Sequence, residues 1–216
     1  MKCPLLLALI LTIIAGPALA DKLDDIKKAG VLRVAAFDSN PPFGFVNETS
    51  RQLVGFDVEI AQAIAKKLGV KLELLATNPA NRIPLLAANK VDLVAANFTV
   101  TEERRKQVEF STPYFATGQK FIARKGVLKA PADIAKLLAL LANAPDKTKY
   151  EISPFALTRE YQAIGIARGE ERLSKEVNDA LLELEKSGQA KKIYDHWFGP
   201  KSRAALPRDF KIGDKV

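Results

Sequence analysis

The sequence predicts an α/β fold in which helices cover a parallel sheet. Segments rich in β-branched and small apolar residues, typical of buried strands, alternate along the chain with segments whose apolar residues recur at helical spacing. A strand–helix–strand–helix–strand order is typical of a parallel sheet. Such sheets bind ligands outside the carboxyl ends of their strands, so the loops that follow the predicted strands are the first candidates for a site.

The first predicted elements have clear boundaries. A short helix is expected at residues 23–28 and a strand at residues 31–36. Residues 38–44 contain two adjacent prolines, which cannot donate the hydrogen bonds of a central strand, so this segment is interpreted as a loop. Apolar residues at every fourth position from 56 to 68 predict an amphipathic helix, and Gly69 is placed to end it.

The same alternation continues through the middle of the chain. Residues 70–74 are expected to form a strand, residues 83–89 a short helix, and residues 91–96 a buried strand. A helix with acidic residues in its first turn is expected at residues 101–108. An extended strand that leaves this unit is expected at residues 119–123.

Two more helices and a tail are expected toward the end of the sequence. An apolar stripe from Val177 to Leu184 predicts one helix, and a final helix contains Trp197. Residues 201–216 are basic and have no periodic pattern, so a loose tail is expected there.

Composition excludes several classes of function. The 216 residues include one Cys and one His, so no His/Cys cluster is present to hold zinc, and neither a metal nor another cofactor is expected. His196 is the one histidine that could serve a catalytic triad, and its place beside two aromatic residues favours a structural role. The net charge of +8 comes from scattered basic pairs, so binding to nucleic acid is not expected.

The first twenty residues have the pattern of a secretory signal peptide. Lys2 precedes an apolar run, and Ala18-Leu19-Ala20 is a small-x-small cleavage site before Asp21. The alternative is a membrane anchor, but the apolar run is about half of the ~20 residues that span a bilayer. The mature chain is therefore expected to begin at Asp21, to lie in the periplasm and not to insert into the membrane.

Two loops that follow predicted strands carry side chains suited to ligand binding. One is residues 38–44, and the other runs from the strand at residues 91–96 into the next helix. In the second loop, Asn97 and Thr99 offer side-chain hydrogen bonds. Arg104, one turn further on, suits a carboxylate because its planar guanidinium can bind both oxygens. Pairing of Arg104 with one of the nearby acidic residues is an equally weighted alternative.

Several motifs resemble one known family. Gly55-Phe56-Asp57-Val58-Glu59-Ile60, with apolar residues after it at helical spacing, is similar to the signature of the bacterial family 3 extracellular solute-binding proteins, the polar amino-acid receptors of ABC importers. Further motifs match that family in the same order: Val31-Leu32-Arg33-Val34, Pro41-Pro42-Phe43, Val91-Asp92-Leu93, Thr101-Glu102-Glu103-Arg104, Phe110-Ser111-Thr112-Pro113-Tyr114, and Ile193-Tyr194 with Trp197-Phe198-Gly199.

The resemblance implies a periplasmic-binding-protein-like (type II) fold, in which two α/β lobes joined by crossing strands close on the ligand. It implies that Arg104 holds the ligand carboxylate and that Asn97 and Thr99 assist. The residues that it places in the ligand site are Asp38, Asn40, Phe43, Asn81, Arg82, Asn97, Thr99 and Arg104.

The match fails in the second lobe. A turn that binds the ligand carboxylate and an Asp that holds the α-ammonium group in the family are both missing after residue 131. Lobe I is therefore expected to be complete and lobe II truncated. The expected organisation is a signal peptide at 1–20, the first part of lobe I at 21–121, a truncated lobe II with the crossing strands at 122–165, the C-terminal part of lobe I at 166–200 and a tail at 201–216.

The function implied by the resemblance is that of a periplasmic substrate-binding component of an ABC importer for polar amino acids. It would act as a monomer on a small amino acid and deliver it to an inner-membrane permease. Because closure of the two lobes supplies the second set of ligand contacts, truncation predicts weak or absent affinity. Two alternatives remain: an exported dehydratase-like enzyme on the same fold, and a truncated paralogue that no longer binds.

Overall fold

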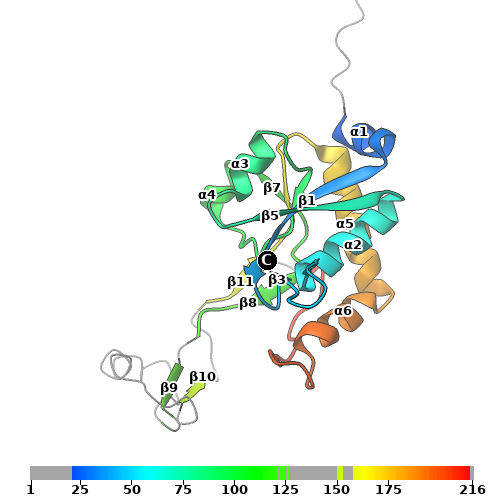
Figure 1. Ribbon diagram of the computed structural model, residues 1–216. Coiled ribbons are helices and arrows are strands. Elements are labelled where there is room, and N and C mark those ends of the chain that lie inside the picture. Colours follow the sequence, from blue (N-terminus) through cyan, green and yellow to red (C-terminus); the bar gives the residue numbers. More distant parts are fainter. Residues whose placement is uncertain (1–20, 121, 125, 127–149, 153–157, 215–216) are drawn as a thin grey trace, which may run out of the picture.

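A five-stranded mixed sheet forms the centre of the protein. The computed structural model describes residues 21–120, 122–124, 126, 150–152 and 158–214. The strand order is β5-β1-β6-β12-β7 (Figure 1). These strands are β5 (Lys71–Thr77), β1 (Val31–Phe37), β6 (Leu93–Val94), β12 (Gly165–Ile166) and β7 (Glu109–Phe110).

Four of these strands run in the same direction, including the three that the sequence predicts, and β12 alone runs against them. β1 pairs with β5 from Val31↔Lys71 onward and with β6 at Val34↔Leu93, in both cases in parallel. The parallel arrangement predicted for the strands near residues 31–36, 70–74 and 91–96 is thus confirmed, and β12 makes the complete sheet mixed because it runs antiparallel to both β6 and β7. The chain leaves the sheet at the end of β7 and re-enters it at the same end, since Gly165 pairs with Phe110.

Close packing explains the glycine in β12. A Cβ atom at Gly165 would lie 2.8 Å from the ring of Phe98, which is fully buried beneath it. Any larger residue would push this ring out of the core, so the reversed strand needs a glycine at this point.

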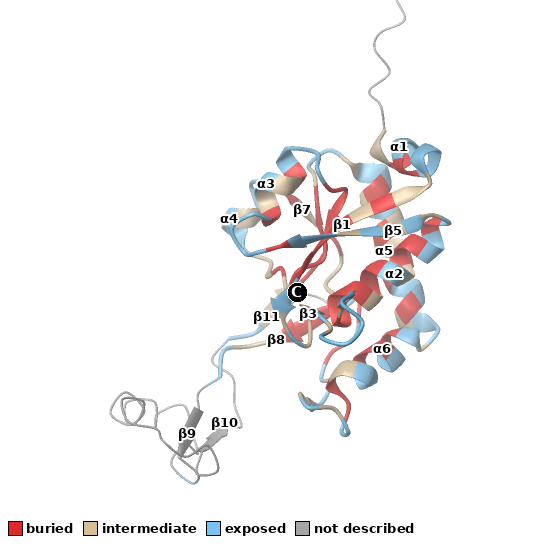
Figure 2. Cartoon of the chain, in the orientation of Figure 1, coloured by how far each residue is buried: buried red, intermediate tan, exposed pale blue. Residues whose placement is uncertain are grey.

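Helices cover both faces of the sheet. Leu32 and Val34 of β1 face a core built with α1 (Lys22–Ala29), α2 (Phe56–Leu68), α5 (Glu171–Lys186) and α6 (Gln189–Phe198). The alternate residues Ala35 and Phe37 face a smaller core under α3 (Arg82–Ala87) and α4 (Glu102–Arg105). Figure 2 shows the buried residues along the sheet and on the helix sides that face it. Among the described residues, no helix is long and apolar enough to cross a membrane.

The shorter strands in the described part of the chain form one three-stranded sheet and two pairs. β2 (Ser39–Asn40), β3 (Gly44–Val46) and β4 (Leu53–Val54) form a small antiparallel sheet. β8 (Phe115–Thr117) pairs with β11 (Glu160–Gln162), and β9 (Ile122–Arg124) pairs with β10 (Tyr150–Ile152). In Figure 1 the pair β9–β10 lies at the end of an arm that extends away from the five-stranded sheet.

Most predicted helices have the expected bounds, but the helix expected at residues 101–108 is a single turn. It ends at Arg105, and the amides of Gln107 and Val108 both donate to the carbonyl of Arg104. Val108 is buried in the smaller core, and β7 begins at the next residue. Burial of Val108 therefore ends the helical turn and leads the chain into the strand. The strand expected at residues 119–123 is also displaced, because the pairing with β11 begins earlier, at Phe115.

The expectation of a loose C-terminal tail is wrong for the described residues up to 214. Phe210 and Ile212 are buried, and the Phe210 ring lies 5.4 Å from that of Phe115. Arg208 is ion-paired with Glu185 of α5, which also accepts a hydrogen bond from the amide of Ile212. Isolated apolar residues in a basic segment produce no periodic pattern, so the sequence does not reveal this packing.

The attachment of the tail can be tested at α5. Glu185→Ala removes both contacts and leaves Arg208 partly buried without its partner, so we expect a loss of about 2 kcal/mol in the free energy of unfolding. Glu183→Ala is the matched control on the same helix, because its ion pair with Lys67 is exposed and should contribute less than about 1 kcal/mol. Equal losses in urea denaturation of the two variants would contradict the docking of the tail.

Candidate functional site

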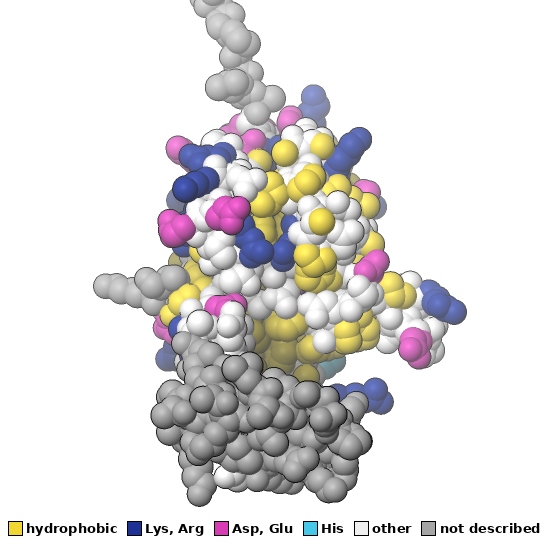
Figure 3. Space-filling model, turned by 90° about the vertical axis from the view of Figure 1, so that its left-hand side faces the viewer, with side chains coloured by type: hydrophobic (Ala, Val, Ile, Leu, Met, Phe, Trp, Pro, Cys, Tyr) yellow, Lys and Arg dark blue, Asp and Glu magenta, His cyan; other side chains and the backbone are white. Residues whose placement is uncertain are grey.

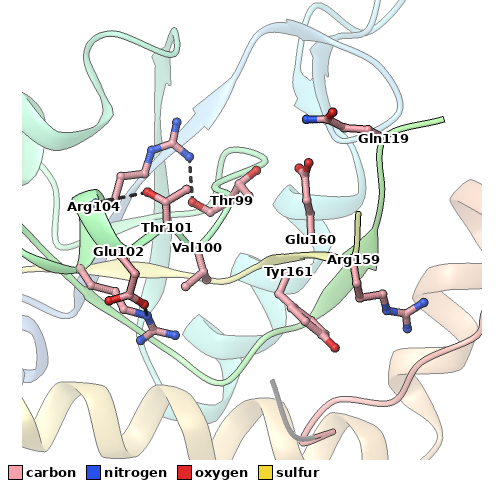
Figure 4. A pocket seen from close by; sticks show the side chains of 10 residues that line it. Thr99, Val100, Thr101, Glu102, Arg104, Gln119, Arg159, Glu160 and Tyr161 are labelled. Atoms are coloured by element: carbon pink, nitrogen blue, oxygen red, sulfur yellow. Dashed lines mark hydrogen bonds and ion pairs between the residues drawn. The ribbon is translucent and has the colours of Figure 1, made fainter. Parts of the chain in front are cut away.

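A polar cavity lies where the loop after β6 meets the crossing strands. It encloses about 580 Å³. One wall comes from residues 99–102, 104 and 105, and the other from Gln119 and residues 159–161 (Figure 4). This is the second of the two loops that the sequence indicates, at a carboxyl strand end. Figure 3 shows Lys and Arg side chains gathered in a hollow on the corresponding side of the molecule.

The guanidinium group of Arg104 lines this cavity without an acidic partner among the described residues. The hydroxyl of Thr101 caps the short α4 by accepting from the amide of Arg104. Nη1 of Arg104 donates to the carbonyl of Thr99 over 2.7 Å. The ion pair at this turn joins Glu102 to Arg105, at 3.7 Å, so the alternative pairing of Arg104 with a nearby acid is not what the structure shows.

A second arginine lies close to the first. The guanidinium carbons of Arg82 and Arg104 lie 4.6 and 5.3 Å from the centroid of the Phe98 ring. Nη1 of Arg82 donates to the carbonyls of Ala96 and Asn97, so this buried side chain braces the loop from inside. Burial, and then repulsion by Arg104, lower the pKa of Arg82 to about 10.

Asp57, at the start of α2, holds the same loop from the other side. Its Oδ2 accepts the amide of Asn97 at 2.7 Å, and its Oδ1 accepts the hydroxyl of Tyr114 at 2.8 Å. Asn97 has a φ of 44°, in the left-handed region, so its peptide is fixed in a conformation that few residues adopt. Burial raises the pKa of Asp57 to about 7, against the opposing effects of Tyr114, the Asn97 amide and Arg82.

Asp57 is not among the residues that the sequence assigns to the site. A signal for it exists, because it lies four residues before Ala61, on the buried side of the amphipathic helix. A carboxylate on a buried helix face needs hydrogen-bond donors from elsewhere in the fold, and these donors mark it as part of a network.

The remaining predicted site residues lie in two other places. Asp38 is exposed just after β1, and Asn40 is partly exposed in β2. Phe43 packs its ring 5.0 Å from Phe115, in the aromatic core. Asn81 is exposed before α3 and makes no capping hydrogen bond through its side chain. Of the predicted site residues, Thr99 and Arg104 line the cavity. Arg82 and Asn97 lie behind it, joined to each other through the Asn97 carbonyl, and the other four are not among the lining residues.

The wall formed by the crossing strands is absent from the sequence-based prediction. Gln119 and Thr158 are neighbours there, and the backbone amide of Gln119 donates to the side-chain hydroxyl of Thr158 at 3.1 Å. Glu160 and Tyr161 of β11 complete this wall. Among the described residues, no group of three or more metal-ligating side chains is found.

The chain belongs to the bacterial extracellular solute-binding proteins, family 3, whose sequence profile matches residues 32–200. It is 26% identical to the L-cystine-binding protein TcyJ of Escherichia coli K12 over 229 positions, which cover 82% of this chain and 86% of TcyJ. It is also 26% identical to the glutamine-binding protein GlnH of Bacillus subtilis over 208 positions, with 72% and 76% covered.

Solved structures confirm the α/β periplasmic-binding-protein fold. A mutant of ArgBP from T. maritima matches with a TM-score of 0.67 and 29% identity, over 82% of this chain and 99% of that chain. AncCDT-1, described as an ancestral amino-acid-binding protein and a precursor of cyclohexadienyl dehydratase, matches with a TM-score of 0.69 and 28% identity, over the same shares. These relatives are binding proteins and not enzymes, and the chain is a solute-binding protein.

The long alignments are longer than the part of this chain that they cover. Because 82% of 216 residues is about 177, the TcyJ alignment contains about 52 positions at which this chain has no residue. The GlnH alignment covers about 156 residues of this chain over 208 positions, so it also contains about 52 positions at which this chain has no residue. A shorter alignment with the glutamine-binding protein of Geobacillus stearothermophilus, 36% identical over 124 positions and 55% of this chain, leaves only about five. Along these two alignments the chain therefore lacks about 52 of the positions that the relatives occupy.

Proposed function

We propose that the protein is the periplasmic substrate-binding component of an ABC importer for polar amino acids, and that Arg104 binds the ligand carboxylate. The observation that carries this proposal is a guanidinium group that lines a polar cavity and has no carboxylate partner among the described residues. Arginine binds a carboxylate through two parallel hydrogen bonds, which gives both strength and orientation.

The local charge also favours an anionic group in the cavity. Arg82 and Arg104 share the Phe98 ring, and the nearest buried counter-charge is Asp57. Because the pKa of Asp57 is about 7, this carboxyl is only partly ionised at neutral pH and does not neutralise both arginines. A ligand carboxylate would supply the missing negative charge.

The other residues of the proposed site have supporting roles. Asn97 and Thr99 would present polar groups beside Arg104, and Arg82 would hold their loop in place. Asp38, Asn40, Phe43 and Asn81 would contact the ligand side chain from the neighbouring loops. Phe43 could do so only with the part of its ring that is not packed against the aromatic core.

The proposed organisation has a complete lobe I and a truncated lobe II. Lobe I would comprise residues 21–121 and 166–200, and the remnant of lobe II with the crossing strands would comprise residues 122–165. The absence of about 52 residues from this chain along each long alignment supports a deletion of this kind. Loss of the ligand contacts that closure of the second lobe would supply leads us to expect an affinity weaker than micromolar.

Membership in an extracellular family supports the proposed export and delivery to a permease. Residues 1–20, which lie outside the described residues, would be the signal peptide, and the mature chain would start at Asp21. The mature protein would act as a monomer at the outer face of the inner membrane, where the permease takes up its ligand.

A thermal-shift screen of the twenty amino acids, with Arg104→Ala beside the wild type, tests the function. We expect at least one polar amino acid at millimolar concentration to raise the melting temperature of the wild type, and Arg104→Ala to abolish the rise. Lys106→Ala is the control, because this exposed lysine lies two residues away and does not line the cavity. A rise that persists in Arg104→Ala would reject the carboxylate site, and calorimetry showing micromolar binding would reject the effect of truncation.

A further inference from the structure

The cavity carries a carboxylate opposite its arginine. Glu160 of β11 lines the same cavity as Arg104. Its Oε1 accepts the hydroxyl of Thr158 at 3.1 Å, and among the described residues it has no cationic partner. Figure 4 shows the side chains of Arg104 and Glu160 on the same side of the return strand, with Tyr161 and Arg159 pointing to the other side.

Backbone contacts fix the two walls relative to each other. Thr99 and Gln162 form an antiparallel bridge, and the amide of Val100 donates to the carbonyl of Tyr161 at 2.8 Å. Arg104 is in turn tied to the carbonyl of Thr99. Because side chains alternate along a strand, this register fixes the face on which Glu160 lies. The separation of the two charged groups is therefore set by lobe I and the return strand, without any residue of lobe II.

Two other acidic groups at this site are already engaged, one in the cavity wall and one behind its loop. Glu102 pairs with Arg105, and Asp57 is fully buried with two hydrogen-bond donors. Glu160 is thus the carboxylate in the described part of the cavity that is available to a ligand cation. In the described part of the cavity, the guanidinium on one wall and the carboxylate on the other each lack an ion-pair partner. Such a site is complementary to a zwitterion.

We propose that Glu160 binds the α-ammonium group of the ligand while Arg104 binds its carboxylate. This inference rests on the proposed function and goes further, because it assigns the ammonium contact to the return strand. The truncated chain would then keep both charged contacts to the backbone of an amino acid. The cavity volume of about 580 Å³ is ample for a single amino acid.

The test compares free amino acids with their N-acetyl forms, which keep the carboxylate and lack the ammonium group. L-Glutamine, L-arginine and their N-acetyl derivatives are titrated into ¹⁵N-labelled protein, and dissociation constants are read from NMR shifts. We expect the wild type to bind the free amino acid at least about tenfold more tightly than its N-acetyl form. Glu160→Gln should abolish this preference by weakening only the free amino acid.

The matched control is Glu103→Gln, at an exposed glutamate of α4 that does not line the cavity, and it should leave the preference unchanged. A merely structural effect of Glu160→Gln would weaken both forms of the ligand equally and would overturn the proposal, as would an unchanged preference. Equal wild-type affinity for the two forms would overturn it as well, even without a variant. If the wild type binds none of the four probes, the proposed function fails together with this inference, whereas retained binding that depends on Arg104 but not on Glu160 rejects the inference alone.

Discussion

Between pH 4 and pH 8, the free energy of unfolding of the wild type is expected to fall by about 4 kcal/mol relative to that of Asp57→Asn. Burial raises the pKa of Asp57 from 3.8 in the unfolded chain to about 7 in the folded protein. Between these two values the folded state holds a proton that the unfolded state has released, so stability is lost as the pH rises. Each unit of difference corresponds to about 1.4 kcal/mol.

The comparison with Asp57→Asn isolates this single group. Asparagine has the same shape, does not titrate, and keeps an oxygen that can accept the amide of Asn97. Every other titrating group is common to the two proteins, so urea denaturation at a series of pH values should give curves that converge at low pH and separate up to about pH 7. Parallel curves across the whole range would show that Asp57 keeps an ordinary pKa.

Phe56→Ala is expected to lower the free energy of unfolding by about 3–5 kcal/mol. The side chain is 2% exposed and lies at the centre of an aromatic group. Its ring centroid is 5.5 Å from that of Phe115 and 5.3 Å from that of Phe198. These partners come from the crossing strand and the last helix, so the cavity left by the substitution would open where three distant parts of the chain meet.

Phe45→Ala is the control for this substitution. Phe45 is only partly buried in β3, and its ring contacts that of Trp197 at 5.8 Å. Its removal should cost about 1–2 kcal/mol, since less apolar surface returns to water. Chemical denaturation of both variants measures the two losses in the free energy of unfolding. If Phe56→Ala lost no more than Phe45→Ala, the aromatic group would not be the centre of the core.

Local patterns predicted most of the fold. The helix at residues 56–68 was specified by its apolar stripe and by Gly69, which adopts a φ of 73° as its C-terminal cap. Strand β1 was specified by its apolar composition. The direction of β12 and the packing of Phe210 depend on contacts between residues far apart in the sequence, and no local pattern records them.

The candidate site was predicted in part, for the same reason. Arg104 and Thr99 lie in one short loop, so the motif in which they occur was enough to bring them together. Glu160 reaches the same cavity from the return strand, 56 positions later in the numbering. Asp57 contacts the loop through the backbone amide of Asn97. Nearly every residue type has such an amide, so the residue type at position 97 does not predict this contact.

The place of β12 in the sheet has a consequence for the order in which the protein can assemble. β12 lies between β6 and β7, which are both made long before it. A ribosome must therefore synthesise about three quarters of the chain before β7 can join the other strands, since its pairing in the sheet is with β12. Until then the five-stranded sheet lacks its last two strands. Late completion of the sheet would suit a chain proposed to pass through a narrow translocation channel, because such a channel admits only an unfolded chain.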